Sequence, residues 1–450
     1  MPTGRPPSTT GTALTRFSTS SRAISTTGVS RAAAGADALT CINEAGRLAQ
    51  SAALFHRNLR GPQVDTSAKL DAILRQAIGP VPGVVAMATT GGETIYEGAF
   101  GTSNLATGAP MRLDSVFGLA SMTKALTSAG AMQLVEQGKL TLDGPIADIL
   151  PELAAPRVLE GFSDAGIPVL RPAAGPITLR HLLTHSAGYG YDTWNVEIGQ
   201  WMAHAGVLRM PRNSSELAAM PLLFDPGTRW NYGINTDIAG KAMEAATGQR
   251  LDHYLREALF GPLRMTDTTA TPTDAQRARL AHPHQRDADG TLRPLDHRFG
   301  GPPGWGIGGG GLLGTGRDYL RFIRMILNKG NLDGARVLWP RSIGAMSRNG
   351  LGDGIRVTPM RSTQPAISND AEFLPGSRKS WSTAFMVNEE ASATGRNPGS
   401  LAWAGIANTY FWIDPTADVG GVVLMQIFPF ADGPALDLFA AFERAVYGSI

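Results

Sequence analysis

A serine and a lysine stand three residues apart at the start of an apolar segment. They are Ser121 and Lys124, in the stretch VFGLASMTKALTSAGAM at residues 116–132. Positions i and i+3 share one face of an α-helix, so the two side chains would be neighbours. A lysine held in apolar surroundings is costly to keep charged. It could therefore accept the Ser121 proton and make that hydroxyl a nucleophile.

The Ser-x-x-Lys pattern is weak when taken alone, because Lys124 could reach solvent while Ser121 only caps a helix. Lysine is rare in this chain, however: there are six, and only Lys124 has a serine three residues earlier. A backbone N–H at Ser121 would also lie at the positive end of the helix dipole, close to a carbonyl carbon under attack. The pair predicts acyl transfer through a covalent serine intermediate.

The pattern of apolar residues predicts strands near both ends of the chain and helices between them. We expect a helix at 65–79, a hairpin at 83–101 around Gly91-Gly92, a helix ending at Gly138, further helices within 140–300, strands at 381–428 and a helix at 435–448. This order predicts an α/β (α+β) fold, in which one antiparallel sheet is built from both termini and a mainly helical lobe is inserted.

The predicted domain limits follow from that order. We expect residues 1–60 to be disordered or an extra N-terminal segment, since the first 36 residues contain four arginines and no acidic residue. Residues 61–125 and 300–450 would form the α/β domain, and 126–299 the helical lobe. The active site would lie at their junction.

Composition excludes several classes of function. The chain has 450 residues, 43% hydrophobic and 17% charged, with a net charge of +2, and it shows no basic region suited to nucleic acid. No apolar run is long enough to span a membrane. A single cysteine, Cys41, excludes internal disulfides and a cysteine-based zinc site. The N-terminus lacks the apolar region of a secretory signal, so we expect a cytoplasmic protein, with secretion or a periplasmic location left open. The oligomeric state is left open as well.

Five ordered motifs carry a resemblance to a known superfamily. They are FGLASMTKALT, ITLRHLLTHSAGYGYD, FDPGTRWNYGINTDIAG, GGGGLLGTGRDYLRFIRMILNKG and AWAGIANTYFWIDP. Together they resemble the serine β-lactamases and penicillin-binding proteins, and most closely the family VIII carboxylesterases, over roughly residues 65–450. The resemblance implies a β-lactamase/transpeptidase-like fold.

The resemblance also implies roles for individual residues. By position, Ser121 is the nucleophile, Lys124 its activating partner and Tyr232 the hydroxyl that completes the proton relay. An ammonium beside a phenol stabilises the phenolate, so whether Lys124 or Tyr232 is the base stays open.

A tripeptide near the C-terminus has a counterpart in the same superfamily. Trp403-Ala404-Gly405 falls where β-lactamases carry Lys-Thr-Gly and the esterases a Trp-Gly-Gly-like triplet. By that match the backbone N–H of Ile406 joins that of Ser121 in the oxyanion hole.

Two departures from the β-lactamase pattern point to neutral esters. Ile234 stands where β-lactamases have asparagine, and Trp403 replaces the cation that meets a substrate carboxylate. The predicted substrate-binding residues are Trp403, Ala404, Gly405, Trp305 and Ile234.

Other motifs are weaker. The run 306–311 fits Gly-x-Gly-x-x-Gly but follows no strand, which argues against a dinucleotide site. It either lets the backbone approach the acyl pocket or forms a structural turn. His181 and His185 lie within a superfamily motif and are interpreted as structural, and no metal or other cofactor is expected.

The sequence thus predicts a carboxylesterase that cleaves neutral, short-chain esters of small molecules. An alternative with the same chemistry is a β-lactamase, an amide or D-peptide hydrolase, or an acyltransferase. An alternative of another class is a catalytically silent sensor or scaffold that resembles penicillin-binding proteins.

Overall fold

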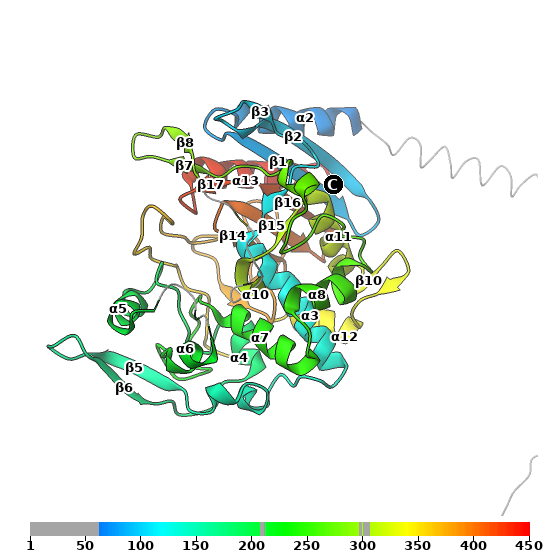
Figure 1. The fold of residues 1–450 in the computed structure, drawn as a ribbon. Helices are drawn as coiled ribbons and strands as arrows, with labels where there is room; N and C mark the ends of the chain where they lie inside the picture. Colours follow the sequence, from blue (N-terminus) through cyan, green and yellow to red (C-terminus); the bar gives the residue numbers. More distant parts are fainter. Residues whose placement is uncertain (1–62, 208–210, 212, 297–298, 300–306) are drawn as a thin grey trace, which may run out of the picture. The chain divides into compact units, whose positions relative to one another are not determined.

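The structure is a computed structural model that describes residues 63–207, 211, 213–296, 299 and 307–450. Residues Val64–Ile450 form one compact unit (Figure 1). Among the described residues no helix is both long enough and apolar enough to cross a bilayer.

The unit mixes helices with short and long strands. The α-helices are α2 (Gln63–Gln76), α3 (Thr123–Glu136), α4 (Leu179–Leu183), α5 (Val196–Ala205), α6 (Ser214–Ala219), α7 (Asn235–Thr247), α8 (Leu251–Leu255), α9 (Asp274–Arg277), α10 (Ile307–Gly310), α11 (Gly316–Leu327), α12 (Pro340–Met346) and α13 (Gly433–Tyr447). The strands are β1 (Gly83–Thr90), β2 (Thr94–Asn104), β3 (Ala109–Pro110), β4 (Phe117–Gly118), β5 (Arg157–Phe162), β6 (Pro168–Pro172), β7 (His284–Arg286), β8 (Leu292–Pro294), β9 (Leu313–Gly314), β10 (Asn331–Leu332), β11 (Ala335–Arg336), β12 (Lys379–Trp381), β13 (Met386–Asn388), β14 (Leu401–Gly405), β15 (Thr409–Asp414), β16 (Val419–Leu424) and β17 (Ile427–Phe428). Short 3-10 turns are η1 (Ala120–Met122), η2 (Ile146–Asp148) and η3 (Pro151–Leu153), and η4 (Arg256–Phe260) is a π-helical turn.

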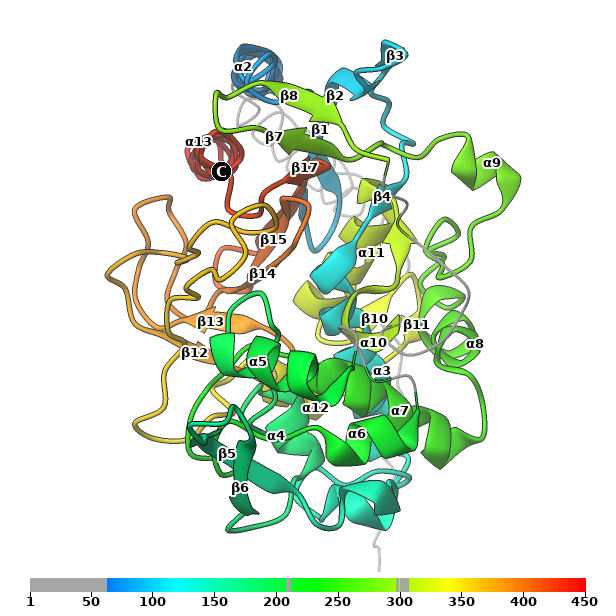
Figure 2. The same ribbon diagram turned by 60° about the vertical axis from the view of Figure 1, so that its left-hand side comes forward.

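The main sheet has eight strands and joins the two ends of the described chain. Its order is β12-β13-β14-β15-β16-β1-β2-β3, and every neighbouring pair is antiparallel. β1 lies between β2 and β16: Met87 is opposite Glu97 of β2 and Val422 of β16. The N-terminal strands thus lie beside the C-terminal ones (Figure 2). This arrangement confirms the fold class predicted from the sequence.

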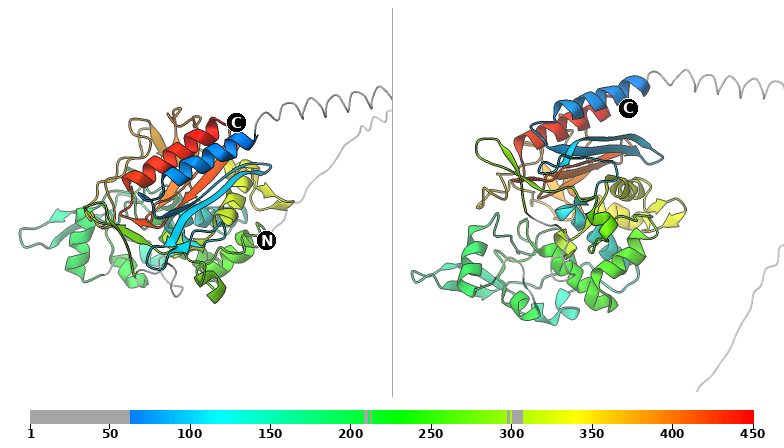
Figure 3. Two further views of the ribbon diagram at one scale, coloured as in Figure 1. Left: turned by 90° about the horizontal axis from the view of Figure 1, so that it is seen from above. Right: turned by 45° about the horizontal axis from the view of Figure 1, so that its top comes forward.

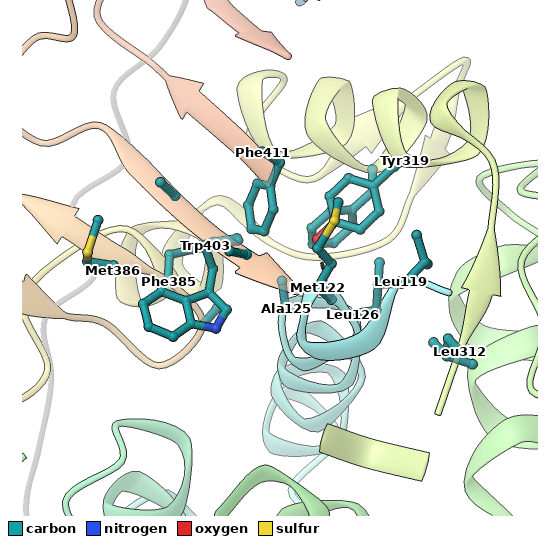
Figure 4. Close-up of a cluster of buried hydrophobic side chains, with 14 of the residues drawn as sticks. Leu119, Met122, Ala125, Leu126, Leu312, Tyr319, Phe385, Met386, Trp403 and Phe411 are labelled. Atoms are coloured by element: carbon teal, nitrogen blue, oxygen red, sulfur yellow. Dashed lines mark hydrogen bonds between the residues drawn. The ribbon is translucent and has the colours of Figure 1, made fainter. Parts of the chain in front are cut away.

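Helices cover both faces of this sheet. On one face α2 and α13 run side by side (Figure 3), and α13 packs on the sheet through the ring pairs Tyr96–Phe442 and Tyr410–Phe439, with centroids 5.6 and 4.8 Å apart. On the other face α11 and the start of α3 meet the sheet (Figure 4), where Tyr319 lies 5.0 Å from Phe411, centroid to centroid. Residues from η1 and α3 therefore stand directly against the core of the sheet.

Helix α3 is buried along almost all of its length, from Thr123 to Leu134. A helix that is apolar all round belongs in a core, as the sequence predicted for this segment. It is followed by Gly138 with φ of +70°, the left-handed residue that commonly stops a helix.

Three features differ from the predicted organisation. The middle of the chain contains the hairpin β5–β6, and β7 pairs in parallel with β17 from the C-terminal region. Helix α3 also runs through the predicted boundary between residues 125 and 126. The limits of the two lobes therefore stay a prediction.

A buried ion pair connects α13 to the loop after β13. Arg396 and Glu443 have side chains only 3% and 1% exposed, and Arg396 Nε lies 2.6 Å from Glu443 Oε1. We expect Glu443→Ala to lower the free energy of unfolding by about 3–5 kcal/mol, because it leaves a buried guanidinium without its partner. Urea unfolding followed by circular dichroism measures this change.

The matched control is Asp370→Ala, which breaks the exposed pair between Asp370 and Arg361. Solvent screens such pairs, so little change is expected. Equal effects of the two substitutions would contradict a structural role for the buried pair.

Candidate active site

Ser121 lies in the short turn η1, directly before α3. It is partly exposed, whereas its neighbours Ala120 and Met122 are buried. Ala120 has φ of +45°, a left-handed conformation that a non-glycine residue rarely adopts. Such strain persists only where the surrounding packing imposes it, and it is frequent at functional sites.

Lys124 is 2% exposed and finds its polar partners entirely within the protein. Its amine lies 3.2 Å from Ser121 Oγ, 3.1 Å from the Tyr191 hydroxyl and 2.7 Å from the carbonyl oxygen of Gly309. The serine–lysine contact predicted from the spacing is therefore present. A protonated amine donates to all three oxygens. A neutral amine has two N–H groups, which match Tyr191 and Gly309, and one lone pair, which is left for the Ser121 proton.

Tyr191 comes from the loop between α4 and α5 and connects Lys124 to a buried carboxylate. Its hydroxyl accepts from Lys124 and donates to Asp237 Oδ2 at 3.4 Å. Burial, and then the negative charge of Asp237, raise the pKa of the Tyr191 phenol well above its usual value. Tyr191 therefore keeps its proton and presents an oxygen lone pair to the amine.

Tyr232, the predicted relay residue, occupies a different place around the same amine. Its hydroxyl accepts from the indole N–H of Trp403 at 3.0 Å, and the Lys124 nitrogen lies over its ring, 4.9 Å from the centroid. The structure thus brings Ser121, Lys124 and Tyr232 together. The phenol oxygen that contacts the lysine is that of Tyr191, and the role of Tyr232 stays a prediction.

Sequence reasoning missed Tyr191, although it lies in the motif ITLRHLLTHSAGYGYD. The available signal was a tyrosine beside an acid, Asp192, at the end of a superfamily motif. Asp237 was missed as well, within FDPGTRWNYGINTDIAG. Neither residue lies at a fixed spacing from Ser121, so only the folded chain reveals the contacts.

The glycine run around residue 309 allows three helices to approach closely. Helix α10 packs against both α3 and α7 (Figure 2). A Cβ on Gly309 would lie 2.1 Å from the carboxylate of Asp237, and Thr127 of α3 donates to the Gly308 carbonyl at 2.8 Å. Close backbone approach therefore explains these glycines, and it places the carbonyl that holds Lys124.

The two segments that carry the predicted oxyanion hole, η1 and the end of β14, lie close together. A Cβ on Gly405 would lie 2.5 Å from the carbonyl oxygen of Leu119, so the end of β14 approaches η1 closely. Ile406, the next residue, lines the same cavity as Ser121. The two backbone N–H groups as an oxyanion hole stay a prediction.

A cavity of about 460 Å³ opens at Ser121. Its described lining is mostly apolar or glycine and consists of Ala120, Ser121, Tyr191, Asp192, Thr193, Trp194, Asp237, Phe299, Gly309, Gly310, Gly311, Ile367 and Ile406. A cavity of this size suits a small molecule.

The predicted substrate-binding residues contribute less to this cavity than expected. Trp403, Ala404, Gly405 and Ile234 are buried, and none is among its described lining residues. Trp403 instead packs against Trp381, with centroids 4.4 Å apart, and donates to Tyr232. Trp305 lies outside the described residues.

His185 fits its predicted structural role. It is fully buried with φ of +57°, and its ring packs 4.8 Å from that of Tyr232, centroid to centroid. Burial, and then the charge of Lys124, lower the pKa of His185 well below its usual value, so the ring is neutral. The Nδ1 atom of His185 lies 3.1 Å from the side-chain nitrogen Nδ2 of Asn235.

The family described as Beta-lactamase matches residues 70–445, and the chain belongs to this family. The predicted membership of the superfamily of serine β-lactamases and penicillin-binding proteins is confirmed. The finer resemblance to family VIII carboxylesterases stays a prediction.

Similar proteins act on acyl groups. The chain is 31% identical over 410 residues to monacolin J acid methylbutanoyltransferase of Aspergillus terreus, covering 86% of this chain and 98% of that protein. It is 33% identical over 399 residues to a lovastatin esterase of Penicillium rubens, covering 84% and 98%. Among solved structures, unliganded simvastatin synthase of Aspergillus terreus superposes with a TM-score of 0.74 at 30% identity, covering 86% and 98%.

We expect Tyr191→Phe to slow acylation of Ser121 roughly 10- to 100-fold, since it removes a hydrogen bond to a charged or proton-accepting amine. The burst of p-nitrophenol from p-nitrophenyl butyrate, followed by stopped flow, measures this step.

Tyr254→Phe is the matched control. Its hydroxyl contacts Gln133 within the core, at 3.5 Å, and its loss should leave the burst unchanged. Tyr232→Phe, measured in parallel, tests the relay predicted from the superfamily. An unchanged burst in Tyr191→Phe would show that this hydroxyl does not act on Lys124.

Proposed function

We propose that the protein transfers acyl groups from neutral carboxylic esters through a covalent intermediate on Ser121, and that a hydroxyl compound is the preferred final acceptor. The observation that carries the proposal is the enclosure of the Lys124 amine. Two oxygens, from Tyr191 and Gly309, match the two N–H groups of a neutral amine, which leaves its lone pair for Ser121, whose Oγ lies 3.2 Å from the nitrogen.

The first half-reaction forms the acyl-enzyme. Lys124 takes the proton of Ser121, and the serine oxygen forms a bond to the ester carbonyl carbon. The oxyanion is met by the backbone N–H groups of Ser121 and Ile406, each such donor typically contributing about 10²- to 10³-fold in rate. The bond from carbon to the alcohol oxygen then breaks, and the proton on Lys124 passes to the departing alcohol. Tyr232 acts with Lys124 in this relay of the proton to the departing alcohol.

The second half-reaction repeats these steps with a new nucleophile. The acceptor hydroxyl gives its proton to Lys124 and attacks the acyl carbon. The bond to Ser121 breaks, and the proton returns to the serine oxygen.

The lining of the cavity favours a neutral donor. Its described residues include the apolar side chains of Trp194, Ile367 and Ile406 and the acids Asp192 and Asp237, but no arginine or lysine. Among these described lining residues a negatively charged substrate would meet two acids and no cation. This supports an ester over an anionic β-lactam or peptide terminus.

Similarity to known proteins supports transfer to a hydroxyl, since a methylbutanoyltransferase and a synthase align over most of this chain. A carboxylesterase, in which water is the acceptor, is the second candidate, and the similarity to a lovastatin esterase favours it. The two candidate functions differ only in the nucleophile that attacks the acyl-enzyme, which is a hydroxyl compound in one and water in the other.

Intact-mass spectrometry after a brief reaction with p-nitrophenyl butyrate tests the shared step. We expect a butyryl adduct that maps to Ser121, that is absent in Ser121→Ala and that falls sharply in Lys124→Ala. Lys241→Ala is the control, because this lysine pairs with Glu244 and is not among the described lining residues of the cavity. A folded protein without an adduct would instead support the silent sensor or scaffold.

Partition of the acyl group distinguishes the two candidate acceptors. With p-nitrophenyl butyrate and rising concentrations of a primary alcohol, we expect p-nitrophenol release to accelerate and the new ester to replace butyrate as the main product. Product analysis by mass spectrometry measures the ratio. Release of butyrate alone at every alcohol concentration would assign the protein as an esterase.

A further inference from the structure

A buried carboxylate lies directly behind the reacting groups, and the mechanism above gives it no role. Asp237 is in the first turn of α7 and is 4% exposed. Its Oδ1 accepts the N–H of Gly309 at 2.7 Å, and its Oδ2 accepts the Tyr191 hydroxyl at 3.4 Å. Both neighbours also contact the Lys124 amine, so Asp237 touches each of the two partners that hold the lysine.

The direction of these hydrogen bonds is fixed by chemistry. A backbone N–H can only donate, and a carboxylate can only accept. With Tyr191 donating to Asp237, the phenol oxygen has to accept from Lys124. The hydroxyl cannot rotate to donate to the lysine lone pair without abandoning the carboxylate.

Asp237 also supplies the negative charge near Lys124. The titratable groups around the amine are Asp237 from α7, Tyr191 and His185 from the segments that follow α4, and Tyr232 from the segment before α7. The phenol of Tyr191 keeps its proton, and the His185 ring is neutral. Burial raises the pKa of Asp237, while the charge of Lys124 and the N–H of Gly309 act in the opposite direction.

We propose that Asp237 is a positioning residue for the acyl-transfer reaction: it orients the Tyr191 hydroxyl so that the lysine lone pair is left for Ser121, and its charge balances the ammonium that forms when the serine gives up its proton. This inference rests on the proposed function. Asp237 acts through Tyr191, Gly309 and Lys124, and needs no contact with the substrate.

The test compares kcat/KM for p-nitrophenyl butyrate across pH in wild type and Asp237→Asn. Asparagine keeps the size of the side chain but removes its charge. The ammonium then loses its counter-charge, so protonated Lys124 is destabilised. The acidic limb of the pH profile of kcat/KM should therefore move to lower pH by about one unit or more. The plateau should also fall at least roughly tenfold, as the amine loses its orientation.

Asp318→Asn is the matched control. Asp318 is also a buried carboxylate in the first turn of a helix, it accepts from Thr268, and it is not among the described lining residues of the cavity at Ser121. We expect its substitution to leave the acidic limb in place. The contrary result is an acidic limb of the kcat/KM profile that stays in place in Asp237→Asn as well, so that only the stability or the plateau falls. That result would assign Asp237 a merely structural role and overturn the proposal.

A second variant decides the case if Asp237→Asn does not fold. Asp237 lines the cavity at Ser121, so formate can reach the space left in Asp237→Ala. We expect formate, but not formamide, to restore activity and to return the acidic limb to its wild-type position. Equal or no effect of the two additives would overturn the proposal. Formation of the Ser121 adduct in wild type is measured separately, so failure of the proposed function is distinguishable from failure of this inference.

Discussion

The site depends on one constraint: an amine buried away from water must find all of its hydrogen-bond partners within the protein. Lys124 is 2% exposed, and the carbonyl of Gly309, the Tyr191 hydroxyl and Ser121 take the place of water around it. An unsatisfied group there would cost several kcal/mol, on the order of a fifth or more of the stability of a typical domain. Helix packing, the glycine run and the buried Asp237 all serve to provide these partners.

The surroundings of the amine strengthen each of these contacts. Tyr232 packs against Trp230, Trp381 and Trp403, with ring centroids 6.4, 6.4 and 4.9 Å away. Aromatic rings exclude water and lower the local dielectric constant, which makes hydrogen bonds and charges act more strongly than they do at a surface. Trp403 packs against Tyr232 and donates to its hydroxyl, and its contact with substrate stays a prediction.

Much of the fold could be predicted from local patterns. Strands β1 and β2 around Gly91-Gly92, the apolar helix α3 and the C-terminal strands each have a periodicity that a window of residues reveals. The hairpin β5–β6 was missed because the segment 157–172 is largely exposed and has no apolar alternation.

The site was predictable only in part, for a physical reason. Ser121 and Lys124 are one helical turn apart, so their contact follows from spacing. Tyr191 reaches the amine through loop geometry, and Asp237 reaches Tyr191 and Gly309 through the packing of α7 against α10, which no local rule encodes. The purpose of the glycines was left open for the same reason, since a Cβ at residue 309 is excluded only by a carboxylate distant in sequence.

The segments that meet at Ser121 are spread across most of the described chain, from η1 through the Tyr191 loop and α7 to Ile406 at the end of β14. During synthesis the serine therefore emerges long before the strand that completes its surroundings. Until then the nascent chain carries Ser121 without the groups that surround it in the folded protein. The cavity that Ser121 shares with Ile406 is therefore complete only once the C-terminal strands have joined the sheet, and a local opening that separates β14 from η1 takes this cavity apart.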